Sequence, residues 1–285
     1  MLRTKALRSP SLRLLGDRDR ADVIELCDRD PVVNVFVSSR VHEVGLDPAR
    51  LGGQIWGFAP GGRLTSLCYA GANLVPVAAT PEAVTAFAGS ARLQGRRCSS
   101  IVGPAPVVRD MWELLRPYWG QPREIRDSQP VMAISGQPLV PPDPKVRPVR
   151  LAELDVLLPA SVAMFTEEVG VSPLGVDGGA AYRARVAELI ATGRAFARIE
   201  DGRVMFKAEI GAVTEHACQV QGVWVRPDLR GRGLAVAGMA AVVEQALGRV
   251  APIISLYVND FNAPARAVYR KVGFTEVATM MSVLF

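Results

Sequence analysis

The chain has 285 residues, of which 49% are hydrophobic and 21% charged, and its formal net charge is +5. This balance excludes a disordered chain, because enough apolar side chains are present to bury a core. The length favours two domains over one. The small excess of Lys and Arg is spread along the sequence, which argues against nucleic acid as a partner.

Membrane insertion and secretion are not expected from the sequence. A membrane-spanning helix needs about 18 to 20 uninterrupted apolar residues, and the longest apolar run, residues 234–247, contains Glu244 and Gln245. The basic start, residues 1–15, lacks both a continuous apolar centre and a small-residue cleavage site. We therefore expect a cytoplasmic protein without a membrane partner.

The cysteines and histidines do not form the spacing of a metal site. Four cysteines are scattered without a CxxC pair, and only two histidines, His42 and His216, accompany them. We expect no metal and buried free thiols instead. These cysteines are Cys27, Cys68, Cys98 and Cys218.

The first half is expected to alternate helices and strands. The hydrophobic periodicity predicts helices near 18–27 and 32–44, then strands near 54–59, 64–70 and 74–78. The glycines and proline at 60–62 predict a hairpin turn. Thr80 and Pro81 predict the start of a helix that runs to about residue 93. A strand at 99–102, a helix at 107–118 and a strand near 130–134 are expected to follow.

A proline-rich segment predicts the domain boundary. Five prolines stand between Gln137 and Pro148, and they preclude a regular helix or a central strand. We expect an amino-terminal domain at 1–136, a linker at 137–148 and a second domain at 149–285.

The second half is expected to repeat the same order of elements. A short strand is predicted at 149–151, helices at 153–165 and 179–192, and antiparallel strands at 195–200, 204–213 and 218–225. Asp201 and Gly202 predict a tight hairpin turn between the first two of these strands. A helix at 233–247, a strand at 253–258, a helix at 263–272 and a closing strand at 274–284 complete the half.

The turn that follows the strand at 218–225 predicts an anion site. It reads Arg230-Gly231-Arg232-Gly233 and leads into a long apolar helix. Glycines let several backbone amides approach a phosphate, and the start of a helix adds partial positive charge. The P-loop pattern is absent, and Val236 replaces the third small residue of a dinucleotide-binding fingerprint. A purely structural glycine turn remains an alternative.

Two blocks together resemble the GNAT superfamily of N-acetyltransferases. The first is Arg230, Gly233 and Ala235 behind the segment Val223-Trp224-Val225. The second runs from Leu256 to Phe274 and contains Asn259, Asn262, Tyr269 and a Gly-Phe pair. The resemblance implies a mixed α+β fold of two tandem GNAT-like domains, each a mostly antiparallel central sheet flanked by helices. The first half has no such turn, so the resemblance implies a degenerate amino-terminal domain without cofactor binding.

The resemblance also implies which residues bind acetyl-coenzyme A or another short acyl-coenzyme A. The loop amides would bind the pyrophosphate, the strand main chain would pair with the pantetheine arm, and the two asparagines would orient the cofactor. Tyr269 would donate a proton to the leaving thiolate. The implied cofactor-binding residues are Val223, Trp224, Val225, Arg230, Gly231, Arg232, Gly233, Leu234, Ala235, Asn259 and Asn262.

The sequence departs from the family where a general base is expected. Many GNAT enzymes carry Glu on the strand before the loop, but Gln219 and Gln221 occupy the corresponding positions. Among the other carboxylates we retain Glu168, at the end of a helix, and Glu209, on the neighbouring strand. For both residues an exposed and solvated position is an alternative to a catalytic role.

We expect an enzyme that transfers an acetyl or short acyl group directly from coenzyme A to a primary amine. The acceptor, a small molecule or a peptide or protein amine, is not specified by the sequence. Two alternatives stay open at this point. A non-catalytic acyl-coenzyme A sensor would bind without turnover, and an aminoacyl-tRNA-dependent transferase would retain tRNA.

Overall fold

The computed structural model of the chain describes residues 11–175 and 178–285. Residues 1–10 therefore lie outside the described part, and with them most of the segment in which a secretory leader was sought. The described chain divides into two compact units, each discontinuous in sequence. Unit 1 comprises residues up to Val131 together with 257–261 and 276–285, and unit 2 comprises 132–256 and 262–275. The expected domains, 1–136 and 149–285, are each continuous.

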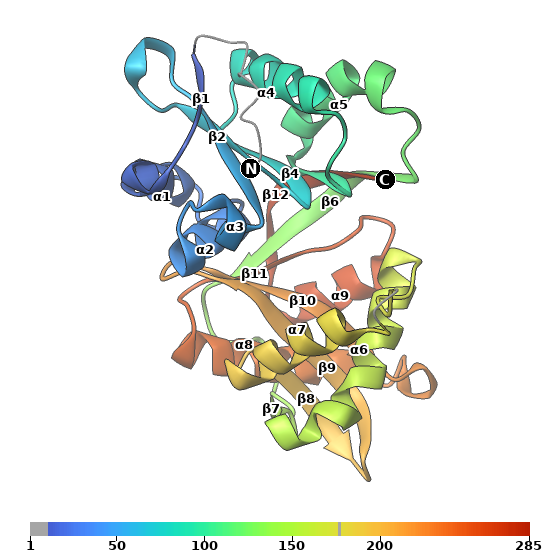
Figure 1. The fold of residues 1–285 in the computed structure, drawn as a ribbon. Helices are drawn as coiled ribbons and strands as arrows, with labels where there is room; N and C mark the ends of the chain where they lie inside the picture. Colours follow the sequence, from blue (N-terminus) through green and yellow to red (C-terminus); the bar gives the residue numbers. More distant parts are fainter. Residues whose placement is uncertain (1–10, 176–177) are drawn as a thin grey trace. The chain divides into compact units, whose positions relative to one another are not determined.

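Unit 1 has the predicted alternation of helices and strands (Figure 1). It also contains two elements that the periodicity did not indicate, a first short strand and a short third helix. Its strands are β1 (Leu12–Leu14), β2 (Gly53–Phe58), β3 (Ser66–Gly71), β4 (Asn73–Val77), β5 (Ser100–Pro104) and most of β6 (Glu124–Ile134) and β12 (Thr275–Leu284). Its helices are α1 (Arg20–Asp28), α2 (Val35–Val44), α3 (Pro48–Leu51), α4 (Pro81–Gln94) and α5 (Ala105–Trp119).

The sheet of unit 1 has the strand order β1-β2-β3-β4-β5-β12-β6. The described pairings are antiparallel except that between β4 and β5. Side chains of β2 alternate between two cores, as expected for a strand covered on both faces. Trp56 packs with α4 and α5, whereas Ile55 packs with α1 and α2. Helices therefore cover both faces of this sheet.

The last strand of the chain belongs to unit 1, not to the half that precedes it. Residues of β12 pair antiparallel with β5, from Met280 opposite Pro104 to Leu284 opposite Ser100. Met281 and Val283 are buried in the same core as α4 and α5. The prediction that residues 274–284 close the second sheet was wrong, because an alternating apolar pattern does not specify which sheet the strand joins.

Unit 2 contains the end of β6 and the elements of the second half (Figure 1). Its other strands are β7 (Arg147–Pro148), β8 (Ala195–Glu200), β9 (Arg203–Val213), β10 (Cys218–Val225) and β11 (Ile254–Tyr257), the last residue of which lies in unit 1. Its helices are α6 (Leu154–Val169), α7 (Ala180–Ala191), α8 (Leu234–Arg249) and α9 (Ala263–Val272).

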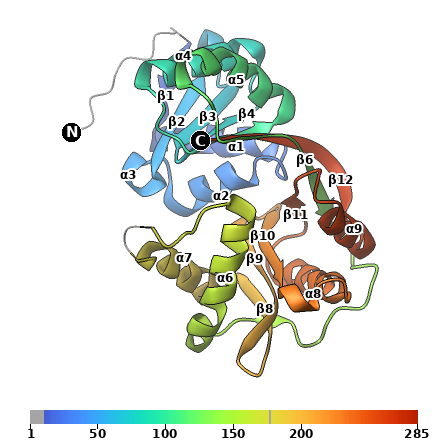
Figure 2. The ribbon, with the colours of Figure 1, turned by 90° about the vertical axis from the view of Figure 1, so that its right-hand side faces the viewer.

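The sheet of unit 2 has the strand order β6-β11-β10-β9-β8-β7. Strands β7 to β10 pair antiparallel, and β10 pairs parallel with β11. Figure 2 shows α6 and α7 on one side of β8, β9 and β10 and α8 on the other. Gly238 lets α8 approach this sheet, since a Cβ at this position would lie 2.9 Å from the ring of Phe206. Each unit is thus a mostly antiparallel sheet flanked by helices, which confirms the expected fold class.

The local turn and cap predictions are largely confirmed. Asp201 and Gly202 have φ angles of 49° and 68°, as a primed hairpin turn requires. The Thr80 hydroxyl accepts a hydrogen bond from the Ala83 amide at 3.3 Å and caps α4. The strand expected at 149–151 is instead Arg147–Pro148, and a single turn of 3-10 helix occupies Leu151–Glu153.

The proline-rich segment has no regular secondary structure from residue 135 to 146. Its backbone is nevertheless bonded within unit 2. The amide of Leu139 donates to the Val272 carbonyl at 2.9 Å, and the amide of Asp143 donates to the Ala237 carbonyl at 2.9 Å. The segment is therefore hydrogen bonded to unit 2 along its length and is not a flexible linker.

Three further observations concern expectations from composition. All four cysteines are buried and unpaired. In the described ranges, no cluster of three His, Cys, Asp or Glu side chains is arranged to hold a metal ion. None of the helices in those ranges combines the length and apolarity needed to cross a bilayer.

Candidate active site

The loop between β10 and α8 presents a row of backbone amides. A turn of 3-10 helix, Pro227–Leu229, follows β10, and Gly231 and Gly233 then have φ angles of 76° and 81°. Gly233 caps α8 and brings no side chain to bond the first amides of the helix. Within the described chain, the amides of residues 231–235 have no backbone acceptor. A Cβ on either glycine would meet nothing within 4 Å, so the loop is open to a ligand.

The arginines of this loop have different partners. Both guanidinium nitrogens of Arg226 bond Asp228, at 2.7 and 2.8 Å. Arg230 donates to Glu167 Oε2 at 2.7 Å and to the Val225 carbonyl at 3.0 Å. Arg232 is exposed and forms no ion pair with any described residue. Of the two arginines expected to support the amides, Arg230 is joined to the end of α6, whereas Arg232 is exposed. The hydrogen bonds of Arg226 lower the pKa of Asp228, and the charge of Arg232 helps to lower it.

Strands β10 and β11 pair along only a short stretch. The described parallel register joins Cys218 to Ile254 and Gln219 to Ser255. Strand β10 then continues to Val225, with a register irregularity against β9 after Gln221 and a φ angle of 60° at Gly222. Residues 223–225 are half-buried. The second half of β10 therefore has one edge that β11 does not cover in the described register.

A buried ion pair lies on the face of the sheet that α6 and α7 cover. Lys207 Nζ donates to Glu209 Oε2 at 3.1 Å, and their side chains are 1% and 10% exposed. Gln221 stands opposite Glu209 in the β9-β10 register, and its Nε2 donates to Glu209 Oε1 at 3.0 Å. The alternative of a solvated face for Lys207 and Glu209 is thereby excluded. Lys207 was not among the predicted site residues, although its alternation with Glu209 placed it on the same face.

Two tyrosines lie close to Glu168. Burial raises the pKa of Tyr269, and the negative charge of Glu168 raises it further. Burial and the charges of Glu209 and Glu168 likewise raise the pKa of Tyr182, whose hydroxyl donates to the Ser161 carbonyl at 2.9 Å. The charge of Glu168 therefore acts on both tyrosines, and that of Glu209 acts on Tyr182. Glu168 itself is exposed, which is the alternative that its position at the end of a helix left open. A half-buried aromatic residue on the sheet-facing side of α7 was the signal for Tyr182.

The two predicted asparagines have local partners. Asn262 is the cap of α9, and its Oδ1 accepts from the Ala265 amide at 3.2 Å. Asn259 lies in unit 1, where its Oδ1 accepts from Gln129 Nε2 at 2.9 Å. Asn262 thus has a structural role as the cap of α9. Roles of both residues in cofactor binding stay predictions.

Comparisons with known proteins agree with this geometry. Residues 178–274 match the Acetyltransferase (GNAT) family. Most of the matched residues lie in unit 2 and include the loop between β10 and α8 and helix α9. Residues 53–157 match a domain of unknown function, DUF4081, and no curated protein matches the chain.

Several solved structures share the fold of nearly the whole chain. An acetyltransferase of the GNAT family from Colwellia psychrerythraea is 13% identical, has a TM-score of 0.56 and is matched over 99% of its length and 96% of this chain. A Drosophila protein is 12% identical with a TM-score of 0.67, and 97% of this chain and 99% of that chain are covered. A tandem GNAT protein from the clavulanic acid biosynthesis pathway is 13% identical with a TM-score of 0.56, covering 96% and 98%. At these identities the likeness shows the tandem GNAT fold.

Unit 1 repeats the strand and helix order of unit 2 but differs from it at the strand edge and at the start of the following helix. Its β4 and β5 also pair parallel at two positions, Asn73 with Ser100 and Leu74 with Ile101. Beyond them Pro76 removes one backbone donor, and its ring would lie 3.3 Å from a Cβ on Gly103 of β5. The first amides of α4 are bonded by Thr80. Unit 1 therefore lacks the open strand edge and the free amides of unit 2.

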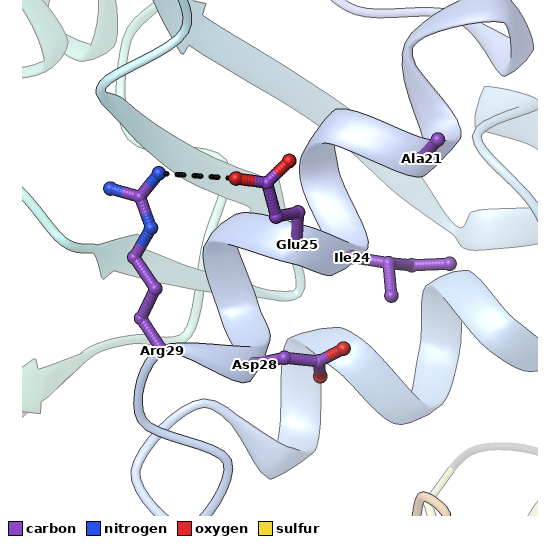
Figure 3. Close-up of a pocket in the computed structure, with 5 residues that line it drawn as sticks. All are labelled: Ala21, Ile24, Glu25, Asp28 and Arg29. Atoms are coloured by element: carbon purple, nitrogen blue, oxygen red, sulfur yellow. Dashed lines mark ion pairs between the residues drawn. The ribbon is translucent and has the colours of Figure 1, made fainter.

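A surface hollow on α1 of unit 1 contains none of the predicted site residues. Figure 3 shows its lining, in which Arg29 and Glu25 form an ion pair of 3.6 Å on the outer face of the helix. Both side chains are more than half exposed. The pair is an ordinary exposed i,i+4 contact of small energetic weight. The lining residues are Ala21, Ile24, Glu25, Asp28 and Arg29.

Proposed function

We propose that this protein is an N-acyltransferase that moves an acetyl or short acyl group from coenzyme A to a primary amine by direct transfer. The observation that carries the proposal is the run of partnerless amides at residues 231–235, directly after a strand with an uncovered edge. An anion and an extended amide chain are the two ligand features that such a pair of sites binds. A coenzyme A pyrophosphate and its pantetheine arm carry both.

The loop residues fit a pyrophosphate. Five consecutive amides at the start of α8 supply hydrogen bonds and the partial positive charge of the helix, and Arg232 supplies a full charge. Positive φ angles at Gly231 and Gly233 hold the amides on one side without a Cβ in the way. The main chain of residues 223–225 would pair with the pantetheine amides. When bound, the coenzyme supplies the acyl thioester.

Tyr269 is suited to donate a proton to the departing thiolate. Its raised pKa keeps the phenol protonated through neutral pH, as a general acid requires. Its hydroxyl has no hydrogen-bond partner among the described residues, so the proton is not committed to another acceptor. The ring is held edge-on against Phe274, with 5.9 Å between centroids.

The acceptor side is suited to an amine. In addition to burial, the charge of Glu168 raises the pKa of both Tyr182 and Tyr269, and the charge of Glu209 raises that of Tyr182. Carboxylates beside a tyrosine attract an ammonium group and can take its proton. A small molecule, a peptide or a protein amine would each provide such a group.

Calorimetry with acetyl-coenzyme A tests the first step. We expect saturable binding to the wild type, and about fivefold weaker binding for Arg232→Ala because one charge contact is lost. Arg203→Ala, in the exposed hairpin between β8 and β9, is the matched control and is expected to bind like the wild type. No binding at millimolar acetyl-coenzyme A would refute the proposal. Release of free thiol in the presence of spermidine, glucosamine and a lysine-containing peptide then tests transfer, and binding without any turnover would favour a sensor.

A further inference from the structure

The buried ion pair on β9 lies opposite the position on β10 where the family carboxylate is missing. The resemblance to GNAT enzymes leads one to expect Glu at 219 or 221 of β10, where this chain has glutamine. Glu209 lies directly across the β9-β10 register from Gln221, and the two side chains are hydrogen bonded at 3.0 Å. A carboxylate is therefore present at this point of the sheet, on the neighbouring strand.

The hydrogen bonds of Glu209 hold its carboxylate in place and still leave acceptor positions on both oxygens. Lys207 bonds Oε2 and Gln221 bonds Oε1, one hydrogen bond to each oxygen. A carboxylate has about four acceptor positions, so lone pairs remain on both oxygens. Burying a carboxylate away from water is unfavourable unless it is paired with a positive charge. The buried ammonium of Lys207 supplies that charge. The pair holds a charged acceptor at a defined place.

Gly222 brings this carboxylate close to the strand edge proposed for the pantetheine arm. A Cβ at Gly222 would lie 3.0 Å from Cδ of Glu209 and 3.0 Å from Cε of Met164. The carboxylate thus packs against the bulge of β10, and the next residue, Val223, begins the segment proposed to pair with the cofactor. A larger residue at 222 would force the side chains of Glu209 and Met164 to move and would be strained by the φ angle of 60°.

We propose that Glu209 is the general base of the transfer reaction and that Lys207 and Gln221 are its positioning residues. This inference rests on the function proposed above. Glu209 would accept one proton from the acceptor ammonium and later release it to solvent. The free amine would then attack the thioester carbonyl, so that a C–N bond forms and the C–S bond breaks. Tyr269 would give its proton to the thiolate and regain one from the acylated nitrogen, which leaves amide, free thiol and one proton in solution.

The groups around Glu209 determine how kcat/KM should depend on pH. Lys207 bonds it from β9 and Gln221 from β10, and the charge of Glu209 acts on Tyr182 of α7. Met164 of α6 lies beside Gly222, as Glu209 does. Glu168, also on α6, acts on both Tyr182 and Tyr269. Lys207 is the cation bonded to the carboxylate. Without this ammonium, the uncharged acid form persists to higher pH.

The test compares three variants in the full chain, with the thiol-release assay and the best amine of the panel above. Glu209→Gln is expected to lower kcat/KM by about 100-fold or more and to abolish its rising acidic limb, with the affinity for acetyl-coenzyme A unchanged. Lys207→Met is expected to shift that limb to higher pH. Glu215→Gln changes a carboxylate that is 74% exposed in the turn between β9 and β10, and this control should match the wild type.

A carboxylate exchange separates a catalytic from a structural role. Glu209→Gln leaves Lys207 buried and unpaired, so this variant can unfold. The double variant Glu209→Gln/Gln221→Glu keeps the charge balance and returns the carboxylate to the family position on β10. We expect the double variant to fold and to have a kcat/KM at least tenfold higher than that of Glu209→Gln. If the single variant unfolds, the kcat/KM of the double variant should lie within about 30-fold of the wild-type value.

The results discriminate between the two proposals. A Glu209→Gln variant that keeps the wild-type rate and acidic limb would overturn the inference, as would a folded double variant without turnover. In both cases a wild type that binds acetyl-coenzyme A and acylates an amine leaves the proposed function intact. A wild type that binds but acylates none of the amines defeats the proposed function, and the assignment of a base falls with it.

Discussion

Replacing Tyr269 by phenylalanine separates the chemistry of its hydroxyl from the packing of its ring. The side chain is 7% exposed, and its ring contact with Phe274 does not involve the oxygen. The hydroxyl has no hydrogen-bond partner in the described part of the chain. The substitution therefore removes an acid and leaves the core unchanged.

The expected magnitudes follow from these contacts. Loss of a hydrogen-bonded buried hydroxyl destabilises a protein by about 1 to 3 kcal/mol, but here no bond is lost, so the free energy of unfolding should change by less than about 1 kcal/mol. Loss of a general acid should lower kcat by about 100-fold, which corresponds to about 2.7 kcal/mol of activation free energy. The affinity for acetyl-coenzyme A should stay within about twofold.

Urea unfolding, calorimetry and thiol release measure these three quantities. Tyr182→Phe is the comparison, because its hydroxyl bonds the Ser161 carbonyl and its loss should reduce stability by about 1 kcal/mol. A Tyr269→Phe protein destabilised by more than about 2 kcal/mol would show that the hydroxyl has a structural partner. An unchanged kcat would remove Tyr269 from the mechanism.

Three further predictions concern the loop, the core and pH. Gly233→Ala should lower stability by about 1 kcal/mol, because φ is 81°, and weaken acetyl-coenzyme A binding at least tenfold in calorimetry; wild-type affinity would contradict the amide site. Gly238→Ala should reduce the unfolding free energy in urea by about 1 to 3 kcal/mol, because its Cβ would lie 2.9 Å from the Phe206 ring, and a neutral result would show that the ring yields freely. Arg147 lowers the pKa of Glu153 from 4.5 to about 2, so the stability it adds is present above pH 4.5 and lost as pH falls to about 2. With the two side chains 22% and 38% exposed, Glu153→Gln should cost about 1 kcal/mol at pH 7 in thermal unfolding, and a difference that persists at pH 2 would refute the assignment.

The sequence predicts well what neighbouring residues determine. The glycine turn at 231–233, the Asn262 cap and the Asp201-Gly202 hairpin depend on residues a few positions apart, and the structure has each of them. The positions of helices and strands follow from periodicity for the same reason.

Features that depend on strand neighbours could not be predicted from the sequence. The pattern of β12 is the same whichever sheet it joins, and only the pairing with β5 reveals its place. Likewise, Glu209 could be placed on a face by alternation, but not opposite Gln221, because that contact depends on the β9-β10 register and its irregularity. The glutamine at position 221 of β10 therefore did not indicate that a carboxylate, Glu209, stands opposite it on β9.

The assignment of β12 to unit 1 has a consequence for dissecting the protein. A cut in the proline-rich segment, the natural place to separate the halves, would deprive the amino-terminal piece of the strand that pairs with β5 and of the core residues Met281 and Val283. That piece would expose an unpaired sheet edge, a template for aggregation. The carboxyl-terminal piece would retain β12 without its partner β5, and it would lose β6, which covers the edge of β11 in the intact chain. The halves are therefore expected to be interdependent in expression, and the binding and transfer assays proposed above should use the intact chain.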